Sequence, residues 1–137
     1  MAILPPGVSA ESFQSAIREF QDAIGRDWVF TSDDDLHSYR DHFSYIKDQP
    51  NELIPSAAVG PDTTEQVQAI VRTANKYKIP LYAISTGKNF AYGGPSPNVR
   101  GSVTVDLVKQ FEANFKQYES HVDDKVKKSG MRAAAAA

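Results

Sequence analysis

The sequence predicts an α+β fold: a helix, a βαβ unit and a further strand, followed by an amphipathic helix. Three observations support this prediction. Apolar residues recur at helical spacing over residues 9–25 and 63–77. Short apolar runs bounded by Gly and Pro, at 54–59 and 81–84, indicate strands. A heptad-like apolar seam over residues 108–128 is typical of an amphipathic helix.

The first helix is predicted between Ser9 and Gly25. The Ser9 hydroxyl can accept a hydrogen bond from a backbone amide of the first turn, and glycine commonly follows a helix end. Between them, apolar side chains at i, i+4, i+7 and i+11 form one stripe: Phe13, Ile17, Phe20 and Ile24. This stripe predicts a helix that packs on the core by one face.

Two short elements and a loop are expected next. Residues 28–30 are a strand candidate, and Ser32 before Asp33, Asp34 and Asp35 is typical of a capped helix start. Carboxylates are stabilised at the positive end of the helix dipole, so capping explains these residues better than paired acid–base catalysis does. Residues 39–50 show no clear period and are expected to form a loop.

The sharpest pattern is a βαβ unit of about thirty residues. Residues 54–59 are its first strand, Asp62 or Thr63 caps its helix, and Pro80 ends the helix before a second strand at 81–84. The helix carries an apolar stripe at i, i+3, i+4, i+7 and i+10: Val67, Ile70, Val71, Ala74 and Tyr77.

The chain changes character after one more strand. Residues 102–107 alternate as a half-buried strand does. Beyond them, apolar residues spaced 3, 4, 3 and 4 apart predict an amphipathic helix: Val108, Phe111, Phe115, Tyr118 and Val122. We therefore divide the chain into residues 1–107, a helix of unclear origin at 108–130, and a tail at 131–137.

Composition excludes several classes of protein. The chain has 137 residues, enough for one domain, and its net charge of −2 argues against a general nucleic-acid binder. It has no Cys for disulfides or thiol chemistry. No run approaches the roughly 20 apolar residues of a membrane span, and residues 1–10 lack the features of a secretory signal. We expect a cytoplasmic protein without membrane partners.

His37 and His42 are five residues apart, a poor match to a helical metal site, so no metal is expected.

A glycine-rich loop follows the second strand of the βαβ unit, reading Ser85-Thr86-Gly87-Lys88-Asn89-Phe90-Ala91-Tyr92-Gly93-Gly94. Such a loop exposes backbone N–H groups, while Lys88 adds a cation and Asn89 an amide donor, which suits an anionic group such as a diphosphate. Ligands of open α/β sheets bind at the carboxyl ends of strands. The loop matches neither the P-loop nor the G-x-G-x-x-G spacing. From the residues alone, a simple glycine-rich turn is an equal alternative.

Several segments, taken in order, resemble one family of flavoproteins. They are Leu4-Pro5-Pro6-Gly7-Val8, residues 55–61, the helix residues 64–71, and residues 84–89 continuing through Tyr92-Gly93-Gly94. Their order and spacing resemble the vanillyl-alcohol oxidase and para-cresol methylhydroxylase (PCMH) family, which includes eugenol oxidase and the 4-phenol oxidases. The resemblance covers residues 4 to 107 and implies the N-terminal portion of a PCMH-type FAD-binding domain.

The resemblance implies FAD as the cofactor and assigns residues to it. In this family one loop holds the FAD diphosphate, and residues 85–89 of this chain match it. With the Tyr-Gly pair that follows, the resemblance implies this cofactor-binding set: Ser85, Thr86, Gly87, Lys88, Asn89, Tyr92 and Gly93. Tyr92 also resembles a residue that binds the phenolate oxygen of the substrate, which would ease hydride transfer to the flavin. A packed loop aromatic is the alternative for Tyr92. Ala91 replaces the family's usual glycine, and its methyl group could narrow the loop.

Two functions stay open. The first is the N-terminal FAD-binding portion of a flavin-dependent oxidoreductase acting on para-substituted phenols, of the 4-hydroxybenzyl alcohol or 4-alkylphenol type. The chain is expected to be too short to catalyse alone, so a phenolic substrate is expected only in an intact enzyme. The second is a truncated or fused non-catalytic module that uses the helix at 108–130 to form a homo-oligomer or to bind a partner helix.

Overall fold

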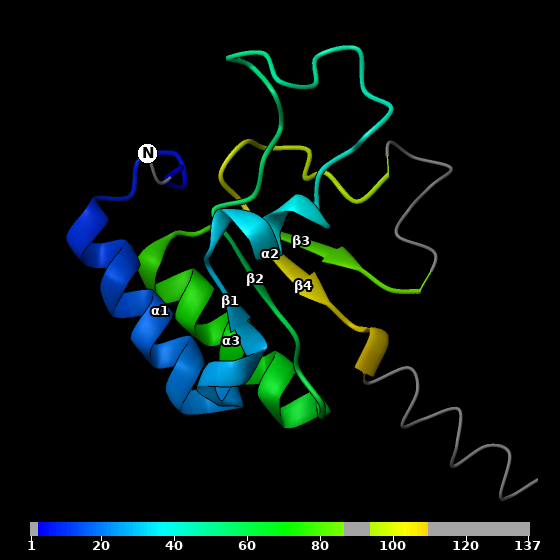
Figure 1. Cartoon of the computed structure of the whole chain (residues 1–137). Helices are drawn as coiled ribbons and strands as arrows, with labels where there is room; N and C mark the ends of the chain where they lie inside the picture. Colours follow the sequence, from blue (N-terminus) through cyan, green and yellow to red (C-terminus); the bar gives the residue numbers. More distant parts are fainter. Residues whose placement is uncertain (1–2, 87–93, 110–137) are drawn as a thin grey trace, which may run out of the picture.

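The computed structural model describes residues 3–86 and 94–109. At its centre is a four-stranded sheet with the strand order β1-β2-β4-β3 (Figure 1). The strands β2 (Ala57–Val59), β4 (Val103–Asp106) and β3 (Leu81–Ile84) run parallel, and β1 (Val29–Phe30) pairs antiparallel with β2. The predicted α+β class is confirmed.

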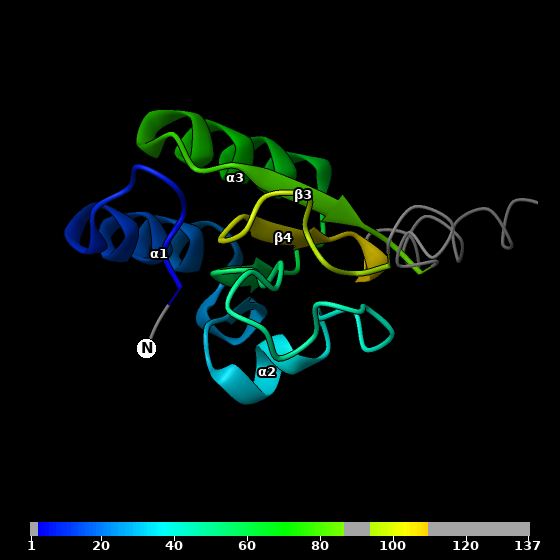
Figure 2. The ribbon, with the colours of Figure 1, turned by 90° about the horizontal axis from the view of Figure 1, so that it is seen from above.

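Two long helices cover one face of the sheet. The helices α1 (Ala10–Ile24) and α3 (Thr64–Tyr77) pack against each other, and a 3₁₀ turn, η1 (Arg26–Trp28), joins α1 to β1. The short helix α2 (Asp33–His37) lies across the sheet from α3 (Figure 2). We call the side covered by α1 and α3 the helical face and the other side the α2 face.

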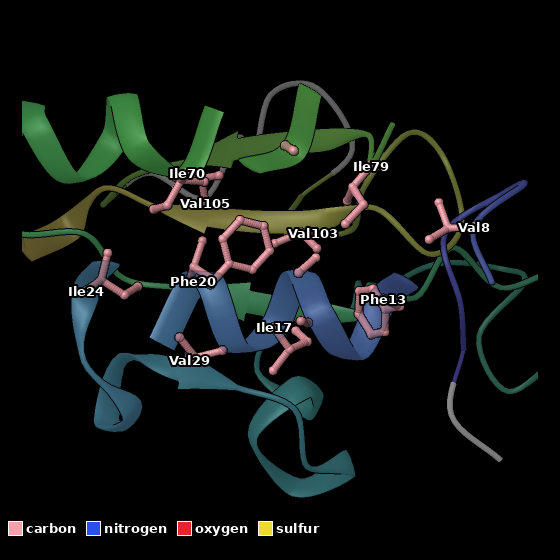
Figure 3. Close-up of a cluster of buried hydrophobic side chains, with 14 residues drawn as sticks. Val8, Phe13, Ile17, Phe20, Ile24, Val29, Ile70, Ile79, Val103 and Val105 are labelled. Atoms are coloured by element: carbon pink, nitrogen blue, oxygen red, sulfur yellow. The ribbon is translucent and has the colours of Figure 1, made fainter. Parts of the chain in front are cut away.

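The main core lies between the helical face and the two long helices. Phe20 is completely buried and sits between α1 and the strands (Figure 3). The predicted stripe of α1 is confirmed, because Phe13, Ile17 and Ile24 are also buried in this cluster. Full burial of such side chains contributes about 1.5–3 kcal/mol each, so the stripe anchors α1 to the sheet.

The helices α1, α2 and α3 begin at N-caps that the sequence predicts. Ser9 and Ser32 each accept a hydrogen bond from the backbone amide three residues later, at 3.2 Å. Of the two candidates before α3, Thr63 accepts from the Gln66 amide at 3.3 Å. The Asp62 amide instead donates to the side chain of Gln66 at 2.6 Å, which completes a reciprocal cap.

The helix α3 ends at Tyr77, before Pro80 as predicted. Lys78 is its C-cap: it adopts a left-handed conformation with φ of 58°, and its N–H donates to the carbonyls of Ala74 and Asn75. This C-cap satisfies terminal carbonyl groups two residues before the proline. The residue that forms this C-cap could not be predicted from the sequence, because no glycine, the usual residue of a left-handed C-cap, lies between Tyr77 and Pro80.

The stripe of α3 is also shifted from the predicted one. Val71 is 42% exposed, whereas Thr73 is buried beside Ile70 and Ala74. The reason is the neighbouring helix, since Glu19 of α1 lies 3.4 Å from the Thr73 hydroxyl. The face that α3 turns inward therefore includes a polar residue that contacts α1.

The strand predicted to be half-buried is the central strand. β4 is buried on both faces, and it lies between β2 and β3, so the predicted βαβ connection passes over one strand. Val103 and Val105 face the helices. Thr104 faces the other side, in register with Ala58 and Tyr82. The alternation of apolar and polar residues predicted one exposed face, but Thr104 on that face is fully buried. Its hydroxyl has no hydrogen-bond partner among the described residues.

Two strand boundaries differ from the prediction. Trp28 belongs to η1, although its carbonyl accepts a hydrogen bond from the Gly60 amide at 2.9 Å and so extends the pairing of β1 with β2. β2 begins at Ala57 instead of residue 54. Pro55 has no N–H to donate to a ladder, which interrupts regular pairing before this point.

The N-terminal segment is fixed to the sheet by a close approach of two backbones. Gly101 has φ of +82°, and a Cβ at this position would lie 2.3 Å from the carbonyl oxygen of Leu4. Only glycine satisfies both conditions. The Leu4-Pro5 segment, which contributed to the family resemblance, therefore packs directly beside the start of β4.

Candidate functional site

The carboxyl ends of the three parallel strands meet at one edge of the sheet. The register pairs Ile84 of β3 with Asp106 of β4, and the Leu107 amide donates to the Ile84 carbonyl at 2.9 Å. Gly60 follows β2 at the same edge, beside Trp28. In open α/β sheets, ligands bind outside this edge.

The predicted cofactor loop leaves the sheet at this edge. Ser85 and Thr86 follow β3 directly, Ser85 half-buried and Thr86 exposed. The other assigned residues lie outside the described ranges: Gly87, Lys88, Asn89, Tyr92 and Gly93, as does Ala91. Two hydroxyl-bearing residues at the end of a parallel strand fit the phosphate groups of FAD, because their side chains and backbone amides can donate hydrogen bonds.

The far end of the loop returns to β3. Gly94 has φ of +75°, and its carbonyl accepts a hydrogen bond from the Tyr82 hydroxyl at 3.3 Å. Nearby, the Asp41 amide donates to the Ser96 hydroxyl at 2.7 Å. Tyr82 of β3 therefore holds Gly94, so the residues before and after the loop both lie beside this strand.

A tyrosine–carboxylate pair, formed by the buried Tyr39 and the half-buried Asp106, lies at the end of β4 and was not suggested by the sequence. The Tyr39 hydroxyl donates to Asp106 Oδ2 at 3.1 Å, and the Val108 amide donates to Asp106 Oδ1 at 3.1 Å. Burial raises the pKa of the Tyr39 hydroxyl well above its usual value, and the nearby Asp106 charge raises it further. Tyr39 therefore stays a protonated donor to Asp106.

A cation lies close to this pair. Lys109 Nζ is 3.8 Å from the centre of the Trp28 ring and 3.0 Å from Asp62 Oδ2. These contacts hold the start of the segment after β4 against both η1 and the N-terminus of α3. Together the residues surround a cavity of about 240 Å³ on the α2 face: Trp28, Phe30, Tyr39, Gly60, Asp106, Val108 and Lys109.

An ionic network organises the predicted loop at 39–50, which forms a series of turns. Arg40 donates two hydrogen bonds to the buried carboxylate of Glu52, from Nε to Oε1 at 2.7 Å and from Nη2 to Oε2 at 2.6 Å. Arg40 also contacts the exposed Asp48 at 2.6 Å. The hydrogen bonds from Arg40 lower the pKa of Glu52, and Arg100 donates to the Glu52 carbonyl.

The rings of His37 and His42 lie beside each other, with their planes tilted by 49°. The ring centres of His37 and His42 are 4.6 Å apart. Among residues 3–86 and 94–109, no three His, Cys, Asp or Glu side chains are grouped as a metal site requires. In the same ranges, no helix is both long enough and apolar enough to cross a membrane.

Comparisons with known proteins point to the same cofactor chemistry. Residues 55–122 match the model of a family described as an FAD binding domain. The chain is 41% identical to the flavoprotein subunit of 4-cresol dehydrogenase [hydroxylating] from Pseudomonas putida over 108 residues, which are 79% of this chain and 20% of that protein. This chain belongs to the vanillyl-alcohol oxidase and para-cresol methylhydroxylase family of FAD-binding flavoproteins.

Solved structures of this family agree with the fold. A substrate-bound para-cresol methylhydroxylase superposes with a TM-score of 0.71 at 41% identity and covers 80% of this chain. A 4-ethylphenol oxidase from Gulosibacter chungangensis, in complex with isoeugenol, has a TM-score of 0.72 at 47% identity and covers 78% of this chain. This chain spans about a fifth of each of these relatives, 21% and 20%.

The family match also extends past the boundary expected at Leu107. It runs to residue 122 and so reaches into the segment 108–130, which we expected to be separate from residues 1–107. Val108 and Lys109 have helical conformation, and the rest of the predicted amphipathic helix lies outside the described residues. The division at 107 stays a prediction.

Proposed function

We propose that this chain supplies the N-terminal FAD-binding portion of a flavin-dependent oxidoreductase that acts on para-substituted phenols by hydride transfer to the flavin. The observation that carries the proposal is the loop at the end of β3, in a chain 41% identical to a cresol dehydrogenase flavoprotein subunit. The substrate is of the 4-hydroxybenzyl alcohol or 4-alkylphenol type, in line with the cresol and ethylphenol in the names of two relatives.

The residues divide between cofactor and substrate. Ser85 and Thr86, with Gly87, Lys88 and Asn89, hold the FAD diphosphate through backbone N–H groups and the Lys88 charge. Gly93 belongs to the same cofactor set. Tyr92 contacts both the cofactor and the phenolate oxygen of the substrate, where a hydroxyl donor stabilises negative charge. When bound, the flavin supplies the hydride acceptor.

Catalysis is proposed only for a protein that also contains the remaining parts of the relatives, since this chain spans about a fifth of their length. The proposed contribution of this chain is to bind and orient FAD. If the segment at 108–130 instead serves only self-association, as its heptad-like spacing suggests, the chain will form oligomers but will not retain flavin.

FAD retention tests the proposal. The purified chain is mixed with FAD, desalted, and examined for flavin absorbance and for a rise in its thermal midpoint, because a ligand that binds only the folded state stabilises it. Lys88→Ala should weaken FAD binding about tenfold, as expected for loss of one charged hydrogen bond. Arg72→Ala is the matched control, because Arg72 carries the same charge on the exposed side of α3. A chain that neither retains FAD nor gains stability from it would contradict the proposal.

The substrate role of Tyr92 needs a separate test. In a longer protein that contains the rest of the relatives' sequence, Tyr92→Phe should leave FAD bound and weaken binding of a 4-alkylphenol about tenfold. Unchanged phenol affinity, measured by titration of the flavin absorbance, would remove Tyr92 from the substrate site and leave the FAD proposal standing.

A further inference from the structure

We infer that the turn segment 41–50 is a self-association surface, on which Phe43 and Tyr45 of one chain pack against the same residues of a second copy. We call residues 41–50 the aromatic arm. The arm lies between α2 and β2, and Figure 1 shows it standing away from α1 and α3. The inference does not depend on the proposed function, because none of these residues is assigned to the cofactor or to the substrate.

Two large aromatic side chains of the arm are almost fully exposed. Phe43 is 97% exposed and Tyr45 is 92% exposed. The other exposed large apolar residues of the described chain are only 38–45% exposed: Leu4, Trp28, Val71 and Val99. Burial of apolar surface drives most protein association, so two neighbouring aromatic side chains held in water mark a surface that a partner can cover.

The arm presents these side chains from an ordered backbone. The Phe43 amide donates to Asp41 Oδ1 at 3.0 Å, and the Asp41 amide donates to the Ser96 hydroxyl at 2.7 Å. At the other end, the Asp48 amide donates to the buried carboxylate of Glu52 at 2.8 Å. Because the backbone of the arm is already ordered in the single chain, association costs it little conformational entropy.

The charges of the arm suit pairing with an identical arm. Lys47 opposes Asp41 and Asp48 in formal charge, so two arms repel each other little. Lys47 forms no ion pair within residues 3–86 and 94–109, while the Asp48 side chain is 72% exposed even in its ion pair with Arg40. A two-fold arrangement can therefore bring Lys47 of each copy to Asp48 of the other.

The size of the surface predicts a weak dimer. Aromatic side chains bury roughly 150–250 Å² each, so four of them from two arms bury roughly 600–1,000 Å². A single arm on a flat, unrelated surface would bury about half of this area, which favours a second copy as the partner. Stable interfaces bury about 1,200–2,000 Å², and smaller ones belong to transient complexes. We expect a dissociation constant on the order of 10–100 µM.

Sedimentation equilibrium of the full chain tests the inference. Between about 5 and 500 µM, the average mass should rise from that of the monomer toward that of the dimer and no further, because a two-fold contact closes on itself. A chain that stays monomeric throughout this range, or whose mass rises past that of the dimer, would overturn the inference.

Substitutions locate the contact. Phe43→Ser and Tyr45→Ser should each raise the dissociation constant about tenfold or more, as loss of a central aromatic anchor does. Val71→Ser, at an exposed apolar position of α3, is the control and should leave the dissociation constant unchanged. All three positions are exposed, so circular dichroism should show the wild-type fold. A dimer that either arm substitution leaves unchanged contradicts the inference.

One more variant separates the arm from the segment 108–130, whose heptad-like spacing also predicts self-association. Phe115→Ser interrupts that spacing, in residues that lie outside the described ranges. Dimers that persist in Phe115→Ser and are lost in Phe43→Ser support the arm. The reverse pattern overturns the inference and assigns self-association to the segment 108–130.

A dilution series followed by NMR of the isotope-labelled chain identifies the contact without any substitution. Amide signals of residues 41–50 should shift as the dimer dissociates, and those of α1 and α3 should not. Shifts confined to residues outside the arm would overturn the inference. Since no flavin is added, the result is independent of whether the chain retains FAD.

Discussion

The two faces of the sheet are held by different kinds of interaction. The helical face is closed by apolar stripes, with Phe20 and Ile70 fully buried against β4. The α2 face has a smaller apolar cluster, which includes Leu36, Ala58 and Ile84, and it adds polar contacts of Arg40 with Glu52 and of Tyr39 with Asp106 beside the cavity. The comparison indicates that the helical face supplies most of the stability, because burial of apolar surface is the dominant favourable contribution to folding.

The largest expected effect follows from breaking the helical face. Phe20→Ala should lower the free energy of unfolding by about 3–5 kcal/mol, because it removes a buried ring and leaves a cavity. Urea unfolding followed by circular dichroism measures this change. Val71→Ala, an apolar truncation at an exposed position of α3, is the control and should cost at most about 0.5 kcal/mol. Equal losses for the two variants would contradict the assignment of the core.

Removing the ionic network of the α2 face should have the next largest effect. Glu52→Gln should lower the free energy of unfolding by about 1.5–3 kcal/mol, since the buried carboxylate accepts two hydrogen bonds from Arg40. Because the pKa of Glu52 is lower in the folded state, its contribution is fully present above about pH 4.5 and is lost as pH falls through the folded pKa. The difference between wild type and variant should therefore shrink in acid; a difference that grows in acid would reverse this account.

The tyrosine–carboxylate pair should contribute less. Tyr39→Phe keeps the ring but removes the hydrogen bond to Asp106, which should cost about 0.5–1.5 kcal/mol. Tyr45→Phe is a suitable control because the Tyr45 side chain is 92% exposed. Thermal unfolding of the two variants should differ, with only Tyr39→Phe below wild type. Identical midpoints would show that the buried hydroxyl does not stabilise the fold.

The smallest effect is expected at the exposed link between α1 and α3. Glu19 contacts Lys76 at 2.5 Å and the Tyr77 hydroxyl at 2.9 Å, and hydrogen bonds from these groups lower its pKa. Glu19→Gln should lower the thermal midpoint slightly at low ionic strength, and the difference should vanish in high salt because exposed charges are screened. A difference that persists in high salt would mean that the contact stabilises by packing.

The features predicted from sequence are local. Ser9, Ser32 and Thr63 cap helices within one turn of themselves, and the stripe ending at Ile24 repeats at the helical period. The position of β4 between β2 and β3 could not be predicted, because strand order depends on contacts between distant segments. The polar Thr104 also made β4 read as half-exposed in the sequence, although the residue is fully buried.

The candidate site was predicted only where a loop motif carried it. Ser85 and Thr86 follow β3 as expected, but Tyr39 and Asp106 are 67 residues apart, and no spacing rule connects them. The same is true of Trp28 and Lys109, which meet only through the sheet. The one signal for Asp106 in the sequence is a carboxylate at the end of an apolar strand, which does not by itself indicate a role.

The most direct test of the central claim is an NMR titration of the isotope-labelled chain with FAD. Saturating FAD is expected to shift the backbone amides of residues 85–89, which follow β3 in the sequence, and to leave the exposed amides of α1 unchanged. Shifts confined to α1 and α3, or no shifts at all at saturating FAD, would contradict the claim that this edge of the sheet holds the cofactor.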